Sequence, residues 1–563
     1  MSVHYDPDAP ITDPHLVTVL LSERDVSGQI PVDFVTVPSV SLRAACFGND
    51  VYDKTSAVKC ISNLLSVGYR RLSVDLYWSP DHRTWSFCPV TIPAGAAASD
   101  SSLHDLGPYS CSGGLDIVAL ANILLGFFRH TNSQVNVYTT YVVVNLHAAA
   151  STSAPDALPP TLSGTQHPSS EESVGHLLDR LLGMYIYRPH ELAKERSNLN
   201  ESWYAVDKDF QPIAQYFTIH EHPNGILSTP NGWPSATYVQ LAQQRRVLLG
   251  YGKIDPQLGD LDTNVDENVL FSPGYITDFH DVSIGSNHTL LSGCLYSSDA
   301  WLVSQVNSSW ALSSRIPVPD EPVAPGTLSQ LSTMVTNLTS CGLSPLLNSS
   351  VMNTTADVDI DLYKNLSLSA TWSWATGEPR HSTGPAGDNG HNRCALMDLS
   401  LAGRWRAANC SDVRPAACRV HNMPYIWTLS EGTAKYSEAA SVCPEDTSFS
   451  VPRTGLENTY LFEQAMDAND TASFDAASHG IWLDFNSLAI PSCWVTGGPD
   501  ADCPYASDPQ QLARRTVLVS TIAGIVICII AALTLFVKCN ANRRNSRRRR
   551  RVIEGWEYEG VPS

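Results

Sequence analysis

The first 300 residues of the chain predict a (β/α) barrel or a doubly wound sheet, and three observations lead to this fold class. Apolar β-type runs such as RLSVDLYW alternate with runs of helical spacing such as TSAVKCISNLLSVGYR. The run VNVYTTYVVVNLHAA is continuously apolar, as in strands buried on both faces of a parallel sheet. This alternation of strand and helix continues over about 270 residues, as it does in parallel α/β folds.

Charge is distributed unevenly along the chain. The 563 residues carry a formal net charge of −20. From Arg514 to the end, ten basic residues stand against three glutamates, so the preceding residues carry −27. Because a region this acidic repels phosphate backbones, we expect it to make no direct contact with nucleic acid.

One segment near the C-terminus predicts a transmembrane helix. Residues 516–537 are 22 residues without a charge, and at about 1.5 Å per residue they are long enough to cross a hydrocarbon core of about 30 Å. Basic residues follow directly, at Lys538, Arg543, Arg544 and 547–551. They predict that residues 538–563 form a basic cytosolic tail beside membrane lipid.

The orientation in the membrane has two interpretations. Residues 1–20 lack the pattern of a secretory signal, so either a signal is missing or the chain is a tail-anchored protein that faces the cytosol. Twelve cysteines before the span favour a lumenal or extracellular ectodomain in the secretory pathway, a single-pass type I protein. The same orientation is favoured by nine glycosylation sequons before the span, at Asn200, Asn287, Asn307, Asn337, Asn348, Asn353, Asn365, Asn409 and Asn469.

Candidate chemistry lies at two predicted strand ends. The run VDLYW places Asp75 at one strand end, and VVVNLHAA places Asn145 and His147 at another. Because the carboxyl ends of barrel strands carry active sites, Asp75 and His147 are the candidates for catalysis. The chain contains no Walker loop, no CxxC zinc spacing, no HExxH and no GxSxG, so neither a cofactor nor a metal is expected.

The N-terminal part resembles the phosphatidylinositol-phospholipase-C-like phosphodiesterase barrels. LLSVGYRRLSVDLYW is similar to their second helix and strand, and PHELAKERSNLNESW to a later barrel segment. The resemblance implies a phosphodiesterase-like barrel over residues 1–300. In those enzymes a histidine follows the first strand and a second histidine is its acid/base partner. The matching segment FVTVPSVSL has no histidine, which argues against that activity.

After a proline-rich linker at residues 301–326, the chain resembles C-type-lectin-like α+β modules. WSWATGEP and CALMDLSLAGRWRAANCSDVRPAACR carry the resemblance, which implies a module at 327–420 with disulfides Cys394–Cys410 and Cys341–Cys418. A second, partial module would occupy residues 421–513, where Cys493 and Cys503 are close enough in sequence to pair. Arg380 replaces the asparagine of the sugar-binding Glu-Pro-Asn motif, which argues against calcium-dependent sugar binding.

As a whole, the chain resembles the fungal maintenance of telomere capping protein 6 family. The stretches VGYRRLSVDLYWSP, WSFCPVTIP, YFTIHEHPNG and SCWVTGG carry this resemblance. It implies a single-pass type I glycoprotein associated with telomere capping. Our main interpretation is an indirect role in capping, with a non-catalytic ectodomain that binds a lumenal or cell-wall ligand, either glycan or protein. The alternatives are an active lumenal phosphodiesterase or glycosidase, and a tail-anchored protein facing the cytosol.

Overall fold

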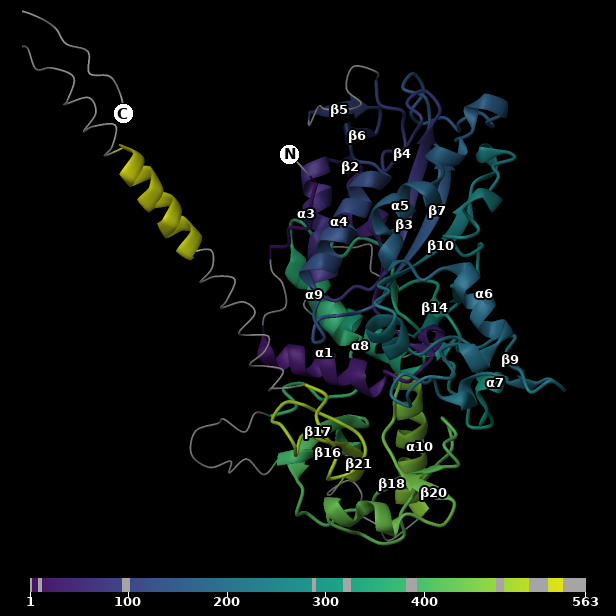
Figure 1. The fold of residues 1–563 in the computed structure, drawn as a ribbon, viewed down its shortest axis with the longest axis vertical. Helices are drawn as coiled ribbons and strands as arrows, with labels where there is room; N and C mark the ends of the chain where they lie inside the picture. The colour runs from purple at the N-terminus through teal and green to yellow at the C-terminus, as the bar shows by residue number, and fades with distance from the viewer. Residues whose placement is uncertain are drawn as a thin grey trace, which may run out of the picture.

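The chain folds into a barrel-like part and a smaller C-terminal part. The computed structural model describes residues 3–8, 13–93, 102–285, 290–316, 326–380, 392–471, 480–505 and 525–539. Figure 1 shows the barrel-like part above, with β3 (Arg71–Ser79), β7 (Thr140–Ala148) and β10 (Val247–Ile254). The C-terminal part lies below, with β16 (Asn392–Asp398), β18 (Ala417–Val420) and α10 (Gly455–Thr471). Helix α1 (Pro14–Val26) crosses between them.

A parallel sheet forms the barrel wall. Its strand order is β10-β7-β3-β1-β15, with bounds Val247–Ile254, Thr140–Ala148, Arg71–Ser79, Ser39–Ser41 and Leu346–Leu347. The short β4 (Thr84–Ser86) pairs antiparallel with the end of β3. Further strands complete the wall less regularly. Among them, β11 (Asp278–His280) pairs in parallel with β14 (Ala311–Ser313) in a separate two-stranded sheet. Single bridges link Phe271 to Gly250 and Ser344 to Leu312.

The two faces of the central strands differ. On β3, Leu72, Val74 and Leu76 are fully buried against the surrounding helices. Because successive side chains of a strand point to opposite faces, Arg71, Ser73 and Asp75 face the barrel interior. The same alternation holds on β7, where residues 142, 144 and 146 belong to the outer core and residues 143, 145 and 147 face inward.

Helices cover the outside of the sheet. These are α2 (Leu42–Cys46), α3 (Lys54–Ser66), α4 (Ile117–His130), α5 (Val174–Leu182), α8 (Thr327–Ser340) and α9 (Ile360–Ser369). Short polar residues begin several of them: the side chains of Asp53, Asp116 and Ser173 each accept a hydrogen bond from a backbone N–H of the first turn. The apolar faces of these helices and the outer face of the sheet form one core.

The barrel-like part extends beyond the predicted boundary. β14 lies inside the expected linker 301–326, and β15 pairs with β1. Leu331, Leu338 and Leu366, from α8 and α9, are buried in the barrel core. Residues 327–369 therefore complete the barrel, and their assignment to a lectin-like module is wrong. Residues 317–325 of the expected linker lie outside the described residues.

The C-terminal part contains two small antiparallel sheets and one long helix. One sheet has the order β17-β16-β21, with bounds Arg404–Asn409, Asn392–Asp398 and Ile481–Asn486, and the other has the order β19-β18-β20, with bounds Trp427–Leu429, Ala417–Val420 and Thr447–Phe449. Helix α10 (Gly455–Thr471) connects β20 to β21 along the chain. Because β16 pairs with β21 and β18 with β20, residues on both sides of position 420 share sheets. The predicted division into modules at 327–420 and 421–513 is therefore wrong.

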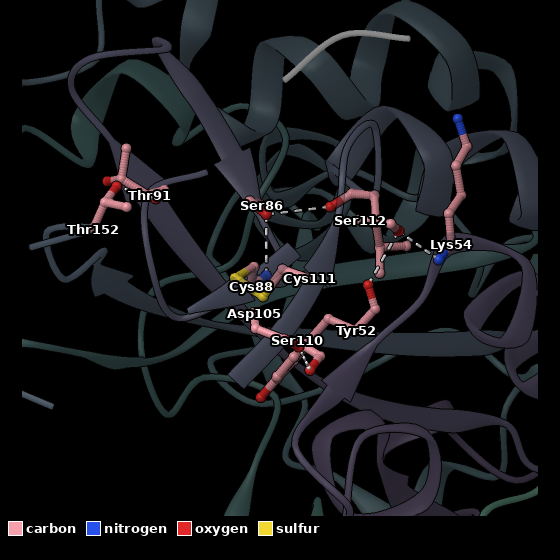
Figure 2. Close-up of a disulfide and its surroundings, with 11 residues drawn as sticks. Tyr52, Lys54, Ser86, Cys88, Thr91, Asp105, Ser110, Cys111, Ser112 and Thr152 are labelled. Atoms are coloured by element: carbon pink, nitrogen blue, oxygen red, sulfur yellow. Dashed lines mark hydrogen bonds between the residues drawn. A yellow bond between two sulfur atoms is a disulfide. The ribbon is translucent and has the colours of Figure 1, made fainter. Parts of the chain in front are cut away.

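Among the described residues, six disulfides connect these elements. The pairs are Cys46–Cys60, Cys88–Cys111, Cys294–Cys341, Cys394–Cys410, Cys418–Cys443 and Cys493–Cys503. Figure 2 shows Cys88–Cys111, which ties the segment after β4 to β6 (Tyr109–Ser112); beside it, the Ser112 hydroxyl donates to the Tyr52 carbonyl.

Two of these pairs are those expected from the sequence, and one expected pair is wrong. The structure joins Cys394 to Cys410 and Cys493 to Cys503. The expected Cys341–Cys418 pair does not form, because Cys341 caps the barrel helix α8 and bonds to Cys294. Cys418 lies on β18 and bonds to Cys443.

The other described elements are short connections. They are β2 (Val51–Tyr52), β5 (Leu103–Leu106), α6 (Pro189–Ser197), β8 (His220–Glu221), β9 (Leu227–Ser228), β12 (Ser283–Ile284), β13 (Leu290–Ser292) and α7 (Val303–Val306). Near the C-terminus, residues 525–539 form a helix whose side chains are exposed. In the part of the chain that the structure describes, no helix combines the length and the apolarity needed to cross a bilayer. Residues 516–524 of the predicted span, and the tail from residue 540, lie outside the described residues.

Candidate ligand-binding site

Polar side chains from three neighbouring strands meet at the carboxyl end of the barrel. β3 and β7 pair in parallel so that Asp75 lies opposite Asn145 and Tyr77 lies opposite His147. Asp255 follows directly after β10, the next strand of the sheet. The two candidates from the sequence, Asp75 and His147, are thus brought together.

His147 lies between two carboxylates. Its Nδ1 is 2.6 Å from Asp255 Oδ2, and its Nε2 is 3.7 Å from Asp75 Oδ1. The second distance is that of an ion pair rather than a hydrogen bond, and Nε2 is buried without a hydrogen-bond partner. The imidazole also stacks on Tyr77, with ring centroids 4.8 Å apart. Burial by itself would lower the pKa of His147, but Asp75 and Asp255 outweigh it and raise that pKa.

Asn145 fixes the position of Asp75. Its side-chain amide donates to Asp75 Oδ1 at 2.7 Å and to Ser73 Oγ at 3.1 Å. Its carbonyl oxygen accepts a hydrogen bond from the Lys253 backbone N–H at 2.9 Å. Burial opposes ionisation of Asp75, yet the interactions with His147 and Asn145 lower its pKa overall. Asp75 is therefore a carboxylate at neutral pH.

Below this cluster the barrel interior is hollow. A cavity of about 510 Å³ lies inside the wall, within the range typical of small-molecule sites. Most of its surface is apolar. It is lined by Arg71, Leu72, Ser73, Asp75, Val143, Asn145, His147, Gly252, Lys253, Gly274, Thr277, Phe279, Leu312 and Leu346.

The cluster can bind and orient a polar group, and it offers one imidazole for proton transfer. His147 is the one histidine that lines this cavity. The first strand, β1, ends at Ser41 and is followed by Arg43, whose charge acts on Asp75 and Tyr77. A two-histidine acid/base mechanism therefore has no second histidine here, and a carboxylate would have to take that role.

Three lining or neighbouring residues were not identified from the sequence. Asp255 directly follows β10, so the search for polar residues at strand ends identifies it once VLLGYGKI is assigned as a strand. Lys253 and Arg71 carry no such signal. Arg71 begins β3, far from the strand end where functional residues are sought, and only its inward direction places it in the cavity.

The residues that carry the lectin-like resemblance serve structural roles in the C-terminal part. Glu378 is buried and accepts hydrogen bonds from the backbone N–H groups of Arg380 and Ala407. Trp405 is fully buried, and its indole N–H donates to Asn458. Arg406 pairs with Asp398. These contacts use the groups that a sugar or a calcium ion would need.

The predicted glycosylation sequons lie on both parts of the molecule. Asn200, Asn307, Asn348, Asn353 and Asn365 are exposed, and Asn337 and Asn409 are partly buried. Asn469 lies near the end of α10, and Asn287 lies outside the described residues. At least five sequons are therefore placed where a glycan would meet solvent.

Comparison with known proteins identifies similar chains of nearly the same length. The family model described as the MTC6 partial TIM-barrel domain matches residues 10–369. A protein of Debaryomyces hansenii named "Maintenance of telomere capping protein 6" is 25% identical, and the match covers 99% of this chain and 96% of that protein. A Saccharomyces cerevisiae protein of the same name is 24% identical, covering 98% and 92%.

Among solved structures, a Ca²⁺-dependent phosphatidylinositol-specific phospholipase C from Streptomyces antibioticus covers 59% of this chain and 97% of its own, at 13% identity and a TM-score of 0.30.

Proposed function

The chain belongs to the family of the MTC6 partial TIM-barrel domain, and on this basis we propose that it is a membrane-anchored lumenal glycoprotein that supports telomere capping indirectly. Its relatives bear the name of that process. In this proposal the ectodomain binds a lumenal or cell-wall ligand, glycan or protein, at the carboxyl end of its barrel. The anchor is residues 516–537, and residues 538–563 form the cytosolic tail.

The disulfides are the observation that carries the lumenal location. Six disulfides lie in the described residues, in both the barrel-like and the C-terminal part. Disulfides persist in oxidising compartments but are rare in the cytosol. The described helix 525–539 supports the anchor, since Ile527, Leu535 and Phe536 are more than half exposed. Side chains this apolar favour a lipid environment over water.

An indirect role follows from the charge of the ectodomain. The residues before Arg514 carry −27, so a surface that binds DNA phosphates is not expected there. In a lumenal topology only the short tail would face the cytosol. Specific crosslinking of the ectodomain to telomeric DNA in cells would contradict this part of the proposal.

A binding rather than catalytic role is supported by the single histidine of the cavity. The alternative, a lumenal phosphodiesterase or glycosidase, is favoured by the position of His147 between Asp75 and Asp255. Assaying the purified full chain on phosphatidylinositol and on aryl glycosides distinguishes the binding role from the enzymatic one. We expect no turnover. Turnover that is absent from a variant carrying Asp75→Asn and His147→Ala would establish the enzyme instead.

The topology is tested by an endoglycosidase mobility shift on the full-length protein. We expect digestion to increase mobility, and simultaneous Asn→Gln replacement at the five exposed sequons to remove most of that shift. A tail-anchored protein facing the cytosol predicts no shift and twelve free thiols before the span. An unchanged mobility would therefore overturn the lumenal topology.

A further inference from the structure

The barrel interior contains a buried cation with no carboxylate partner. Arg71 lies at the start of β3 and is 3% exposed. Its Nη1 donates to the Ile276 carbonyl at 2.7 Å, while its Nε is buried without a hydrogen-bond partner. Among the residues that the structure describes, no carboxylate lies within ion-pair distance of this guanidinium.

Two aromatic rings hold Arg71 in place. The guanidinium carbon lies 5.1 Å from the ring centroid of Tyr141 and 5.3 Å from that of Trp310. These cation–π contacts stabilise a positive charge but do not neutralise it. Burial lowers the pKa of Arg71 to about 10, so the group is still a cation at neutral pH. A buried charge without a counter-ion is costly, and an anion bound beside it would recover part of that cost.

The cavity connects Arg71 with the polar cluster at the barrel mouth. Arg71 and Asp75 are four residues apart on the same face of β3, which corresponds to about 13 Å along the strand. Barrel interiors are usually filled by layers of bulky side chains. Here Ser73, Gly252 and Thr277 stand among the lining residues and leave the space open.

The walls between the two ends are apolar. Val143, Leu312 and Leu346 line the cavity, and Phe279 is exposed at its edge. At the mouth, the positive charges of Lys253 and Arg43 balance the carboxylates of Asp75 and Asp255. An anion that enters the barrel therefore meets no net repulsion there.

We propose that this cavity binds an organic anion, a carboxylate or a phosphate monoester, whose acidic group pairs with Arg71 and whose apolar body lies along Val143, Leu312 and Leu346. The inference rests on the proposed ligand-binding function and names the chemistry of the ligand. The ligand needs both an acidic group and an apolar body, because Arg71 lies at the inner end of the cavity and the apolar wall lies between Arg71 and the mouth.

Calorimetric titration of the full chain in a non-ionic detergent tests the proposal, with empty micelles as the blank. Phenyl phosphate supplies the anion and the apolar body, phenol the body alone, and inorganic phosphate the anion alone. We expect phenyl phosphate to bind at least about tenfold more tightly than either of the other two, the size of one charge-assisted hydrogen-bonded contact. Phenol binding as tightly as phenyl phosphate would overturn the proposal, and so would inorganic phosphate doing so.

Variants locate the contact. Arg71→Met should abolish the preference for phenyl phosphate over phenol, whereas Arg129→Met, which removes an exposed arginine at the end of α4 and away from the cavity, should keep it. An unchanged preference in folded Arg71→Met would reject the assignment to Arg71. If that variant does not fold, Ser73→Leu fills the cavity without removing the charge, and it should lose phenyl phosphate binding; retained binding would place the ligand elsewhere. The endoglycosidase mobility shift is independent of all these titrations. If phenyl phosphate does not bind as expected, the proposed membrane topology is unaffected.

Discussion

Asp33 is a carboxyl group buried beside the barrel core. It is 4% exposed, Ser309 donates a hydrogen bond to its Oδ2 at 2.7 Å, and its Oδ1 has no hydrogen-bond partner. Burial outweighs that hydrogen bond and raises the pKa of Asp33 to about 7. Since the raised pKa means that folding favours the protonated form, the stabilisation is fully present below the unfolded pKa of about 4 and is lost as pH rises through about 7.

Asp33→Asn should remove this pH dependence. Between about pH 4 and pH 7 the free energy of unfolding of the unmodified chain should fall by as much as about 4 kcal/mol from this group, and the variant should lack that part of the slope. Urea unfolding at several pH values measures it. Asp207→Asn, at an exposed position, is the control and should leave the slope unchanged. Parallel slopes for Asp33→Asn and the unmodified chain would contradict the prediction.

Gly252 is required by the polar cluster. A Cβ at this position would lie 2.2 Å from Asn145 Oδ1 and 2.9 Å from Val143 Cγ1. Gly252→Ala should therefore displace Asn145 and break its hydrogen bonds to Asp75 and to the Lys253 backbone, lowering the free energy of unfolding by about 1–3 kcal/mol. Chemical denaturation measures this loss. Gly432→Ala, where a Cβ would meet open space, should have little effect, and equal stability of the two variants would refute the steric argument.

At the scale of residues, the site was partly predictable. Asp75 lies in the middle of β3 and His147 near the end of β7, and the parallel pairing of these apolar strands brings them together. Asp255, directly after β10, was missed because its strand contains two glycines and has a weak apolar pattern. Arg71 was not predictable, since nothing in the run YRRLSVDLYW distinguishes an inward unpaired arginine from a solvated one.

At the scale of elements, the disulfide Cys294–Cys341 joins the segment after β13 to the end of α8. The sequence separation is 47, against 10 for Cys493–Cys503. By loop-closure entropy the first should contribute about 4 kcal/mol and the second about 2.7 kcal/mol. Peptide mapping without reduction should recover Cys294 linked to Cys341. Replacing both cysteines of a pair by serine should lower the free energy of unfolding more for Cys294–Cys341 than for Cys493–Cys503. A peptide linking Cys341 to Cys418 would restore the pairing expected from the sequence.

The same helix shows why the barrel boundary was not predictable. The long strands β3 and β7 and the helices between them carry clear periodicity, and the barrel class follows from them. The last wall strand, β15, has two residues, too few to show any period. Sequons become frequent from about residue 300, and those between residues 307 and 365 lie on the surface of the barrel-like part rather than marking a new domain. The barrel core needs α8 and α9 to cover the face of β1 and β15, a requirement that appears only in three dimensions.

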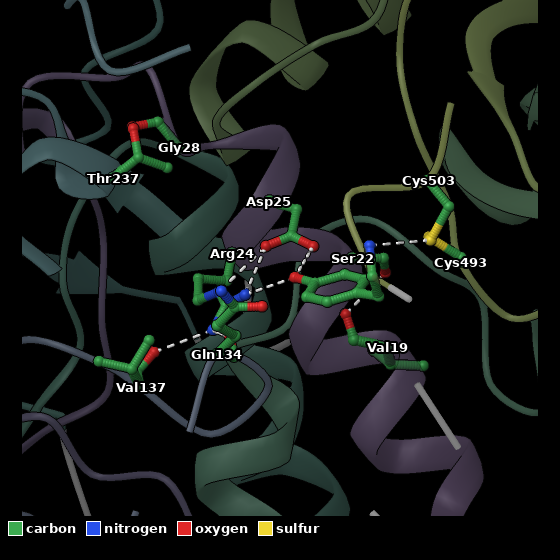
Figure 3. A network of polar contacts seen from close by, with 11 residues as sticks. Val19, Ser22, Arg24, Asp25, Gly28, Gln134, Val137, Thr237, Cys493 and Cys503 are labelled. Atoms are coloured by element: carbon green, nitrogen blue, oxygen red, sulfur yellow. Dashed lines mark hydrogen bonds and ion pairs between the residues drawn. A yellow bond between two sulfur atoms is a disulfide. The ribbon is translucent and has the colours of Figure 1, made fainter. Parts of the chain in front are cut away.

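At the scale of the whole molecule, helix α1 holds the two parts together. Glu23 is partly buried, and its Oε1 accepts hydrogen bonds from the backbone N–H groups of Trp372 and Ser373 and from the Ser373 hydroxyl, at 2.7–2.9 Å. One residue further, Arg24 pairs with Asp25 and donates to Tyr505 Oη at 2.7 Å, while its other amino group donates to backbone carbonyls of the barrel (Figure 3). A segment near the N-terminus thus fixes the C-terminal part to the barrel.

This arrangement predicts that unfolding of the two parts is coupled through Glu23. Glu23→Ala leaves three buried donors without an acceptor, which should cost about 3 kcal/mol at the contact between the parts. Calorimetric unfolding of the full chain should then change from one transition to two, with the lower one accompanied by protease cleavage near residues 370–380. Glu201→Ala, at an exposed position, should keep the single transition. If Glu23→Ala also unfolds in one transition, the two parts are joined chiefly by the apolar contacts of α1 with Trp372 and Trp374, and the polar contacts of Glu23 only orient them.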